Sequence, residues 1–268
     1  MLWFHIVFLS LIQGVTEFLP ISSSAHLLLP SKLLDWPDQG LAFDVAVHVG
    51  SLVAVSWYFR KDIIRLVMAW FDAITTSTSS KDSQLAWWVI IATIPAVLVG
   101  LVFNDFIEEN FRSINVIAYT TIIFGILLWC ADAFFTNKKK EYDLTLPNVV
   151  WIGIAQAVAL IPGTSRSGVT MTVTRALGVS REASARFSFL LSIPLILAAG
   201  SYKFLELLSL NVEIEWGIIA SGVFLSFISA YACIYFFLKW LNTIGFTPFL
   251  FYRLFLGVAL LCISYLNV

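Results

Sequence analysis

Glu17 and Ser23 are residues near the start of the chain whose types and spacing could do chemistry. Gln13 lies four residues before Glu17, so the two side chains would share one face of a helix. A carboxylate is costly to bury in an apolar segment, which makes Glu17 a candidate functional group. We expect Ser23 to be a nucleophile, with His26 or Glu17 accepting its proton. Water activated by Glu17 is the alternative.

A second polar cluster surrounds Arg166, in the segment Pro-Gly-Thr-Ser-Arg-Ser-Gly-Val-Thr at residues 162–170. A helix that begins near Thr164 would direct free N–H groups and a positive dipole end at an anion. The planar guanidinium of Arg166 suits phosphate oxygens. We therefore predict a phosphate site, although a serine-rich turn at a helix junction would look similar. Its expected ligands are Gly163, Ser165, Arg166, Ser167 and Thr170.

The composition places these clusters in a membrane protein. Of the 268 residues, 59% are hydrophobic and only 12% are charged, with 23 Phe and 10 Trp. A soluble protein of this length cannot bury so much apolar surface. The composition excludes a soluble enzyme and a secreted disulfide scaffold. The formal net charge of −1 leaves no basic face for a phosphate backbone, which excludes a nucleic-acid partner.

Hydropathy predicts an all-α polytopic membrane protein with a single membrane domain over residues 1–268. Two apolar stretches, at 2–30 and 147–178, are interrupted by Pro, Ser and Gly, and we interpret them as re-entrant helix pairs. No Lys or Arg precedes Lys32, so we expect the first stretch to belong to the membrane domain rather than to a secretory signal. About six transmembrane helices are expected, at 41–59, 85–103, 114–136, 185–200, 216–238 and 249–266.

The two halves of the chain, roughly 1–136 and 147–268, have the same layout of one broken pair followed by three spans. Three spans are an odd number, so the second half must be inverted, and inverted repeats place a site near the midplane where the breaks meet. Aligning the prolines of the two breaks, with one deletion, matches Ser23 with Ser165. Chance similarity between apolar sequences is the alternative explanation.

The distribution of basic residues predicts the orientation. Lys and Arg gather in alternate connections, as at Arg60–Arg65 and Lys138–Lys140, and the opposite connections are mainly acidic. Basic connections face the cytoplasm in most membrane proteins. Both termini would then lie on the outer side.

The two motifs together resemble those of the undecaprenyl-diphosphate phosphatase family, the bacterial bacitracin-resistance proteins. Gln13-Gly-Val-Thr-Glu17 fits a Glu/Gln-x-x-x-Glu pattern. Residues 162–170 fit Pro-Gly-x-Ser-Arg-Ser-x-x-Thr without a mismatch. The resemblance covers essentially the whole chain. One departure is mild, since Gln13 leaves a single carboxylate in the first motif.

The resemblance implies an enzyme that dephosphorylates a polyprenyl diphosphate lipid, the C55 carrier of cell-wall glycans, in the bacterial plasma (inner) membrane. It implies a site that opens to the outer side. It also implies a divalent cation, Mg²⁺ or Ca²⁺, which Glu17 and perhaps Gln13 would hold through oxygen. Membrane lipids are the other expected partners, together with a homodimer. A transporter or flippase of the lipid phosphate is the alternative, because inverted repeats are typical of transporters.

Overall fold

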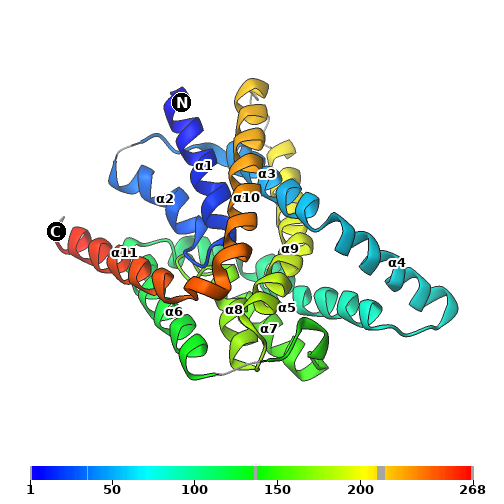
Figure 1. The fold of residues 1–268 in the computed structure, drawn as a ribbon. Coiled ribbons are helices and arrows are strands. Elements are labelled where there is room, and N and C mark those ends of the chain that lie inside the picture. The colour runs from blue at the N-terminus through cyan, green and yellow to red at the C-terminus, as the bar shows by residue number, and fades with distance from the viewer. Residues whose placement is uncertain (1, 35, 136–137, 210–214, 267–268) are drawn as a thin grey trace.

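The computed structural model describes residues 2–34, 36–135, 138–209 and 215–266, and within these ranges the chain forms helices and no β-strand. The all-α prediction is therefore confirmed for this part of the chain. Figure 1 shows the arrangement. The helices are α1 (Trp3–Phe18), α2 (Ser23–Leu33), α3 (Gly40–Tyr58), α4 (Arg60–Thr76), α5 (Lys81–Asn110), α6 (Ile114–Phe134), the short 3-10 helix η1 (Glu141–Asp143), α7 (Leu146–Val158), α8 (Arg166–Ala176), α9 (Arg181–Ser209), α10 (Trp216–Ile244) and α11 (Thr247–Leu266).

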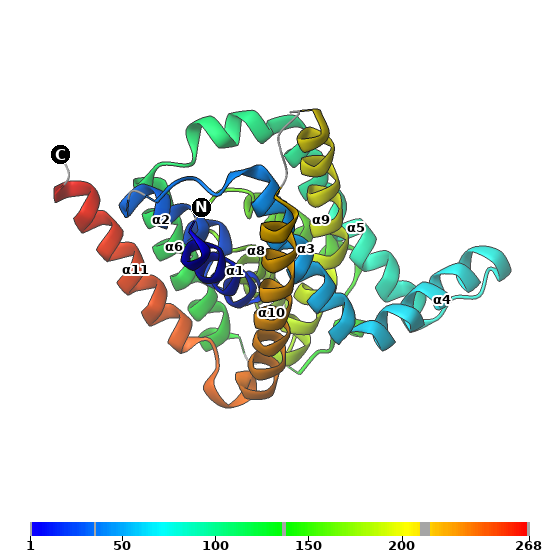
Figure 2. The same cartoon turned by 90° about the horizontal axis from the view of Figure 1, so that it is seen from above.

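Six of the described helices, α3, α5, α6, α9, α10 and α11, are long and apolar enough to cross a membrane. They coincide with the six predicted spans, so the chain is a multi-pass membrane protein. Helix α5 has 30 residues and is about 45 Å long, which exceeds the roughly 30 Å of a bilayer's hydrocarbon core. Helix α4 projects from the body together with the start of α5 (Figures 1 and 2).

Both interrupted stretches form pairs of short helices, α1 with α2 and α7 with α8. The second helix of each pair begins after a serine in an unusual conformation: Ser22 has φ 74° and Ser165 has φ 69°. Non-glycine residues with positive φ are uncommon, so this shared conformation is a specific feature. Each serine also bonds the hydroxyl two residues on, at 3.2 Å, between Ser22 and Ser24 and between Ser165 and Ser167.

This shared backbone corrects the alignment of the two breaks. It pairs Ser22 with Ser165, and Ser23 therefore with Arg166, whereas the proline-based alignment pairs Ser23 with Ser165. Ser22 and Ser165 are 143 residues apart (165 − 22), and Gln13 and Gln156 are also 143 apart (156 − 13). The two breaks therefore match without the deletion that aligning their prolines requires.

The pairs are packed crosswise between the halves. Helix α1 packs along α10, and α7 packs along α5, while α6 and α11 pack against each other. Seen from above, α1 lies between α6 and α11 on one side and α3 and α10 on the other (Figure 2). Gly14 permits the α1–α10 approach, because a Cβ there would lie 2.5 Å from the Ser226 carbonyl oxygen. An inverted repeat would produce this packing, and the two-half organisation stays a prediction.

Candidate active site

Glu17 is the residue on which the two breaks converge. It lies in the last turn of α1 and is 8% exposed. Its Oε1 accepts a hydrogen bond from Arg166 Nη2 at 2.8 Å. Its Oε2 accepts the Ser23 hydroxyl at 2.6 Å. Arg166 and Ser23 are the first residues of α8 and α2, so the end of one helix meets the starts of two others. An acid, a hydroxyl and a guanidinium therefore share one point.

Gln13 completes the surroundings of Glu17. Its Nε2 donates to Glu17 Oε2 at 3.0 Å, as their four-residue spacing predicts. Its Oε1 is buried and has no hydrogen-bond partner among the described residues, and the same is true of Gln156 Oε1. An unpaired buried acceptor is costly unless a ligand satisfies it.

The oxygens of Glu17 and Gln13 can hold a divalent cation only together with oxygens of a bound substrate. The described residues contain no group of three His, Cys, Asp or Glu side chains that could hold a metal ion by themselves. Mg²⁺, however, is often held by one or two carboxylates together with substrate phosphates. Glu17 and the unpaired Oε1 of Gln13 are suitable hard donors for that arrangement.

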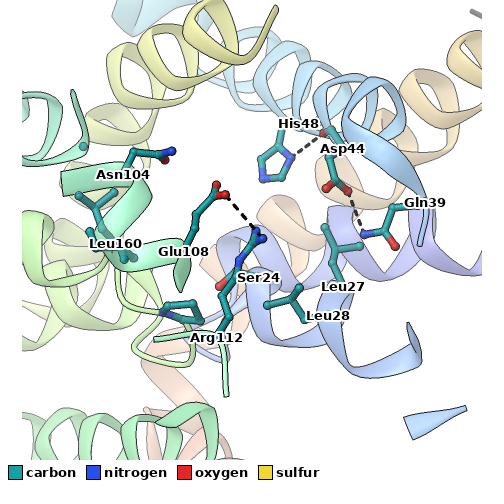
Figure 3. A pocket seen from close by; sticks show the side chains of 13 residues that line it. Ser24, Leu27, Leu28, Gln39, Asp44, His48, Asn104, Glu108, Arg112 and Leu160 are labelled. Carbon is teal, nitrogen blue, oxygen red and sulfur yellow. Dashed lines mark hydrogen bonds and ion pairs between the residues drawn. The ribbon is translucent and has the colours of Figure 1, made fainter. Parts of the chain in front are cut away.

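A cavity of about 530 Å³ opens from Glu17, Ser23 and Arg166. It is bordered by Ser22, Ser24 and Ser165 from the breaks and by apolar side chains of α3 and α9. A second pocket of about 210 Å³ adjoins it and shares several lining residues (Figure 3). The polar and charged residues that line both are Ser24, Gln39, Asp44, His48, Glu108 and Arg112.

The structure does not bring His26 to this cavity. Its Nδ1 lies 2.7 Å from the Ser22 carbonyl oxygen, which can only accept, so Nδ1 carries a proton. Its Nε2 lies 2.5 Å from the Tyr252 hydroxyl. Both ring nitrogens are thus engaged, and neither contacts Ser23. Sequence reasoning placed His26 beside Ser23 because the residues are close in the chain, but the structure directs the His26 ring to Ser22 and Tyr252.

His48 faces the cavity instead. Its Nδ1 lies 2.8 Å from the Asp44 carbonyl oxygen, so the proton is again on Nδ1. Nε2 lies 3.9 Å from Glu17 Oε2. Figure 3 shows the imidazole directed into the pocket. The only sequence signal for His48 was its four-residue spacing from Asp44.

The predicted phosphate ligands divide into two groups. Ser165 and Arg166 line the cavity. Ser167 instead donates to the Leu19 carbonyl oxygen at 2.9 Å, which joins the two breaks. Thr170 bonds the Arg166 carbonyl oxygen and the Ser188 hydroxyl, at 2.9 and 2.7 Å.

Gly163 serves packing rather than the cavity. It has φ +88°, and a Cβ there would lie 2.6 Å from the Ile117 carbonyl oxygen of α6. The backbone of the second break therefore lies directly against α6. Gly163 was predicted to be a phosphate ligand, but its close contact is with a helix.

Sequence reasoning missed Arg253. This residue of α11 is fully buried, and its guanidinium donates to backbone carbonyls of both breaks. It is the only charged residue in the apolar run 249–266. A charge within a membrane span is a functional candidate by default, and that signal was available.

The fold and the site define a polytopic membrane protein in which an acid, a hydroxyl and an arginine meet between two broken helix pairs. The sequence model of one family, described as "Bacitracin resistance protein BacA", matches residues 6–259. The chain belongs to this family.

Curated relatives of similar length agree. A protein of Aliivibrio salmonicida named undecaprenyl-diphosphatase is 56% identical over 97% of this chain and 98% of its own length. Relatives with the same name from Alteromonas mediterranea and Teredinibacter turnerae are 57% and 55% identical, each over 96% of this chain and 97% of their own length.

Proposed function

We propose that the protein is an undecaprenyl-diphosphatase, which hydrolyses the lipid diphosphate to undecaprenyl phosphate and inorganic phosphate. The observation that carries this proposal is the contact of Glu17 with both Ser23 and Arg166, in a chain whose relatives have this name. The activity recycles the lipid carrier of cell-wall synthesis and gives bacitracin resistance. A transporter is not favoured, because the relatives are named as enzymes and because transport needs no nucleophile.

In the proposed reaction, the Ser23 hydroxyl attacks the terminal phosphorus while its proton moves to Glu17 Oε2, to which it already donates. A bond forms between Ser23 Oγ and phosphorus, and the bond to the bridging oxygen breaks. Undecaprenyl phosphate leaves with that electron pair. Water then attacks the phosphorus of the phosphoserine, and its proton goes to a base in the cavity. The bond between phosphorus and Ser23 Oγ breaks, Ser23 Oγ regains its proton from Glu17, and inorganic phosphate leaves.

Arg166 would bind the phosphate oxygens through its planar fork. In the described structure it pairs with Glu17, so the substrate must share or replace that partner. The free N–H groups at the start of α8 add positive potential at the same point. Glu17 activating a water molecule directly remains the competing mechanism, and it uses the same residues without a phosphoserine.

A divalent cation, Mg²⁺ or Ca²⁺, is part of the proposal. Glu17 and Gln13 would hold it together with substrate oxygens, and when bound it would neutralise charge on the diphosphate. The buried, unpaired Oε1 of Gln13 supports this assignment.

We place the protein in the bacterial inner membrane with both termini on the outer side. The cavity supports an outer opening, because its lining includes residues of the mainly acidic connections that the charge pattern assigns to that side. These residues are Glu108, Arg112, Lys203 and Glu206. A homodimer stays a prediction to which no residue is assigned.

The test is phosphate release from a prenyl diphosphate by the purified protein in detergent, where no transport can occur. We expect turnover by the wild type and loss of most of it in Glu17→Gln. A wild-type protein that binds the lipid without releasing phosphate, under any added divalent cation, would contradict the proposal. Trapping of ³²P on Ser23 would separate the phosphoserine route from direct attack by water.

A further inference from the structure

Arg253 binds both helix breaks at once. Its Nη1 donates to the Pro20 carbonyl oxygen of the first break at 3.0 Å. Its Nη2 donates to the carbonyl oxygens of Gly163 and Thr164 in the second break, at 2.9 and 3.1 Å. Its Nε donates to the Thr121 carbonyl oxygen of α6 at 2.9 Å. One guanidinium therefore fixes three elements relative to one another.

The fold makes room for this guanidinium with two glycines. A Cβ at Gly125 of α6 would lie 3.0 Å from Arg253 Cβ and 3.3 Å from its Nε. A Cβ at Gly168, in the first turn of α8, would lie 3.1 Å from Arg253 Nη1. These distances are tighter than ordinary contacts, so a side chain at either position would require Arg253 to shift by a few tenths of an ångström. Arg253 is thus an integral part of the junction.

The charge of Arg253 has no carboxylate partner in the described part of the chain, where all its hydrogen-bond partners are carbonyls. The side chain is 0% exposed. A buried, unpaired cation is costly, and the carbonyl dipoles offset only part of that cost. A nearby anion would offset more of it. Ser22 and Ser165 line the cavity. Arg253 binds the carbonyl of Pro20, two residues before Ser22, and that of Thr164, one residue before Ser165.

We propose that Arg253 is the positioning residue of the site and the second cation of its anion-binding region. It holds Ser22 and Ser165 in their strained conformations by binding the peptide groups that precede them. Across that layer of peptide groups it also contributes a positive charge to a diphosphate or phosphate in the cavity. This proposal rests on the proposed function and names a residue for it outside the two sequence motifs.

The planar fork is essential to this role. Arginine presents five donors in a fixed plane, and Arg253 uses its three nitrogens toward carbonyls in different directions. A lysine ammonium keeps the charge but places its donors at a single point, so it cannot hold two breaks. Arg253→Lys removes the planar donors but keeps the charge, whereas Arg253→Met removes both. The two variants therefore separate the effect of the donors from that of the charge.

The test compares Arg253→Lys, Arg253→Met and Gly125→Ala with Gly217→Ala. Gly217 is a matched control, because a Cβ on this helical residue would meet nothing within 4 Å. Gly125→Ala displaces the guanidinium by a few tenths of an ångström without removing it, so it keeps the test decisive if an Arg253 variant fails to fold. The measurements are kcat and KM for a prenyl diphosphate, and the thermal midpoint with and without inorganic pyrophosphate.

We expect kcat to fall at least tenfold in Arg253→Lys and severalfold in Gly125→Ala, because small misplacements of reacting groups are expensive. KM should change less, and Gly217→Ala should match the wild type. Pyrophosphate should raise the thermal midpoint of the wild type and of Arg253→Lys. The increase should be smaller in Arg253→Met. A purely structural residue would lower the midpoint without changing this ligand-dependent shift.

Wild-type kcat in both Arg253→Lys and Gly125→Ala would overturn the positioning role. An unchanged pyrophosphate shift in Arg253→Met would overturn the charge role. A wild type that releases no phosphate but shows a shift that Arg253→Met loses would contradict the proposed function while supporting this inference. The two failures are therefore distinguishable.

Discussion

Glu17 and Arg166 form an ion pair of 2.8 Å although 149 residues separate them along the chain. Each comes from a different broken helix pair, at the end of α1 and at the start of α8. The pair is only 8% and 11% exposed, so each charge depends on the other for compensation. We expect a bound phosphate to share or replace the contact of Arg166 with Glu17, which would couple substrate binding to release of the Glu17 carboxylate.

Arg166→Ala should abolish phosphate release while the protein stays folded and inserted. Arg166→Lys should be nearly as inactive, because a point charge does not reproduce a bidentate fork. The check is turnover of a prenyl diphosphate in detergent, with gel filtration to establish folding. Turnover near the wild-type rate in the lysine variant would disprove the proposed binding role.

Glu17→Gln should lose at least a hundredfold in kcat, on the order of 3 kcal/mol, because the amide can neither take the Ser23 proton nor balance Arg166. Added Mg²⁺ or Ca²⁺ should not restore it. A chelator should inactivate the wild type, and either cation should reverse that loss. If chelated wild type keeps full activity, the cation is not needed and Glu17 acts as a base only.

Ser23→Ala should lower kcat at least a hundredfold, on the order of 3 kcal/mol, because Ser23 is the serine that donates to Glu17. Ser22→Ala and Ser24→Ala should lose less, since these hydroxyls bond each other at 3.2 Å. The three variants are assayed together at saturating substrate. Retention of more than about a tenth of the wild-type rate by Ser23→Ala, about 1.4 kcal/mol, would exclude a serine nucleophile in favour of water.

The fold was predictable because membrane thickness fixes the length of apolar runs. All six spans were found, but their ends were not. Helix α5 extends from Lys81 to Asn110, whereas hydropathy indicated 85–103. The extra turns are polar, and their start is set by the mutual hydrogen bonds of Ser80 and Ser83 rather than by hydropathy.

The site was predictable where residue type carried the signal. Glu17 and Arg166 stand out because charges are rare in apolar segments. The proline-based alignment of the two breaks was wrong by one residue. The positive φ of Ser22 and Ser165 is a backbone property that a serine in the sequence does not indicate. Proline, the most visible residue of each break, occupies non-equivalent positions.

The role of His26 provides the last prediction. Its Nδ1 donates to the Ser22 carbonyl oxygen, and its Nε2 is engaged by Tyr252, so we expect it to hold the first break rather than to accept a proton. An asparagine amide nitrogen can take the place of Nδ1 but cannot act as a base. His26→Asn should therefore keep more than a third of wild-type kcat, whereas His26→Leu, which lacks the donor, should lose at least tenfold.

His48 is the matched control, because its Nε2 faces the cavity 3.9 Å from Glu17 Oε2. If a cavity-facing imidazole receives the proton of the attacking water, His48→Asn should lose activity that His26→Asn retains. Equal, severe losses in His26→Asn and His26→Leu, with His48→Asn fully active, would return the proton-accepting role to His26.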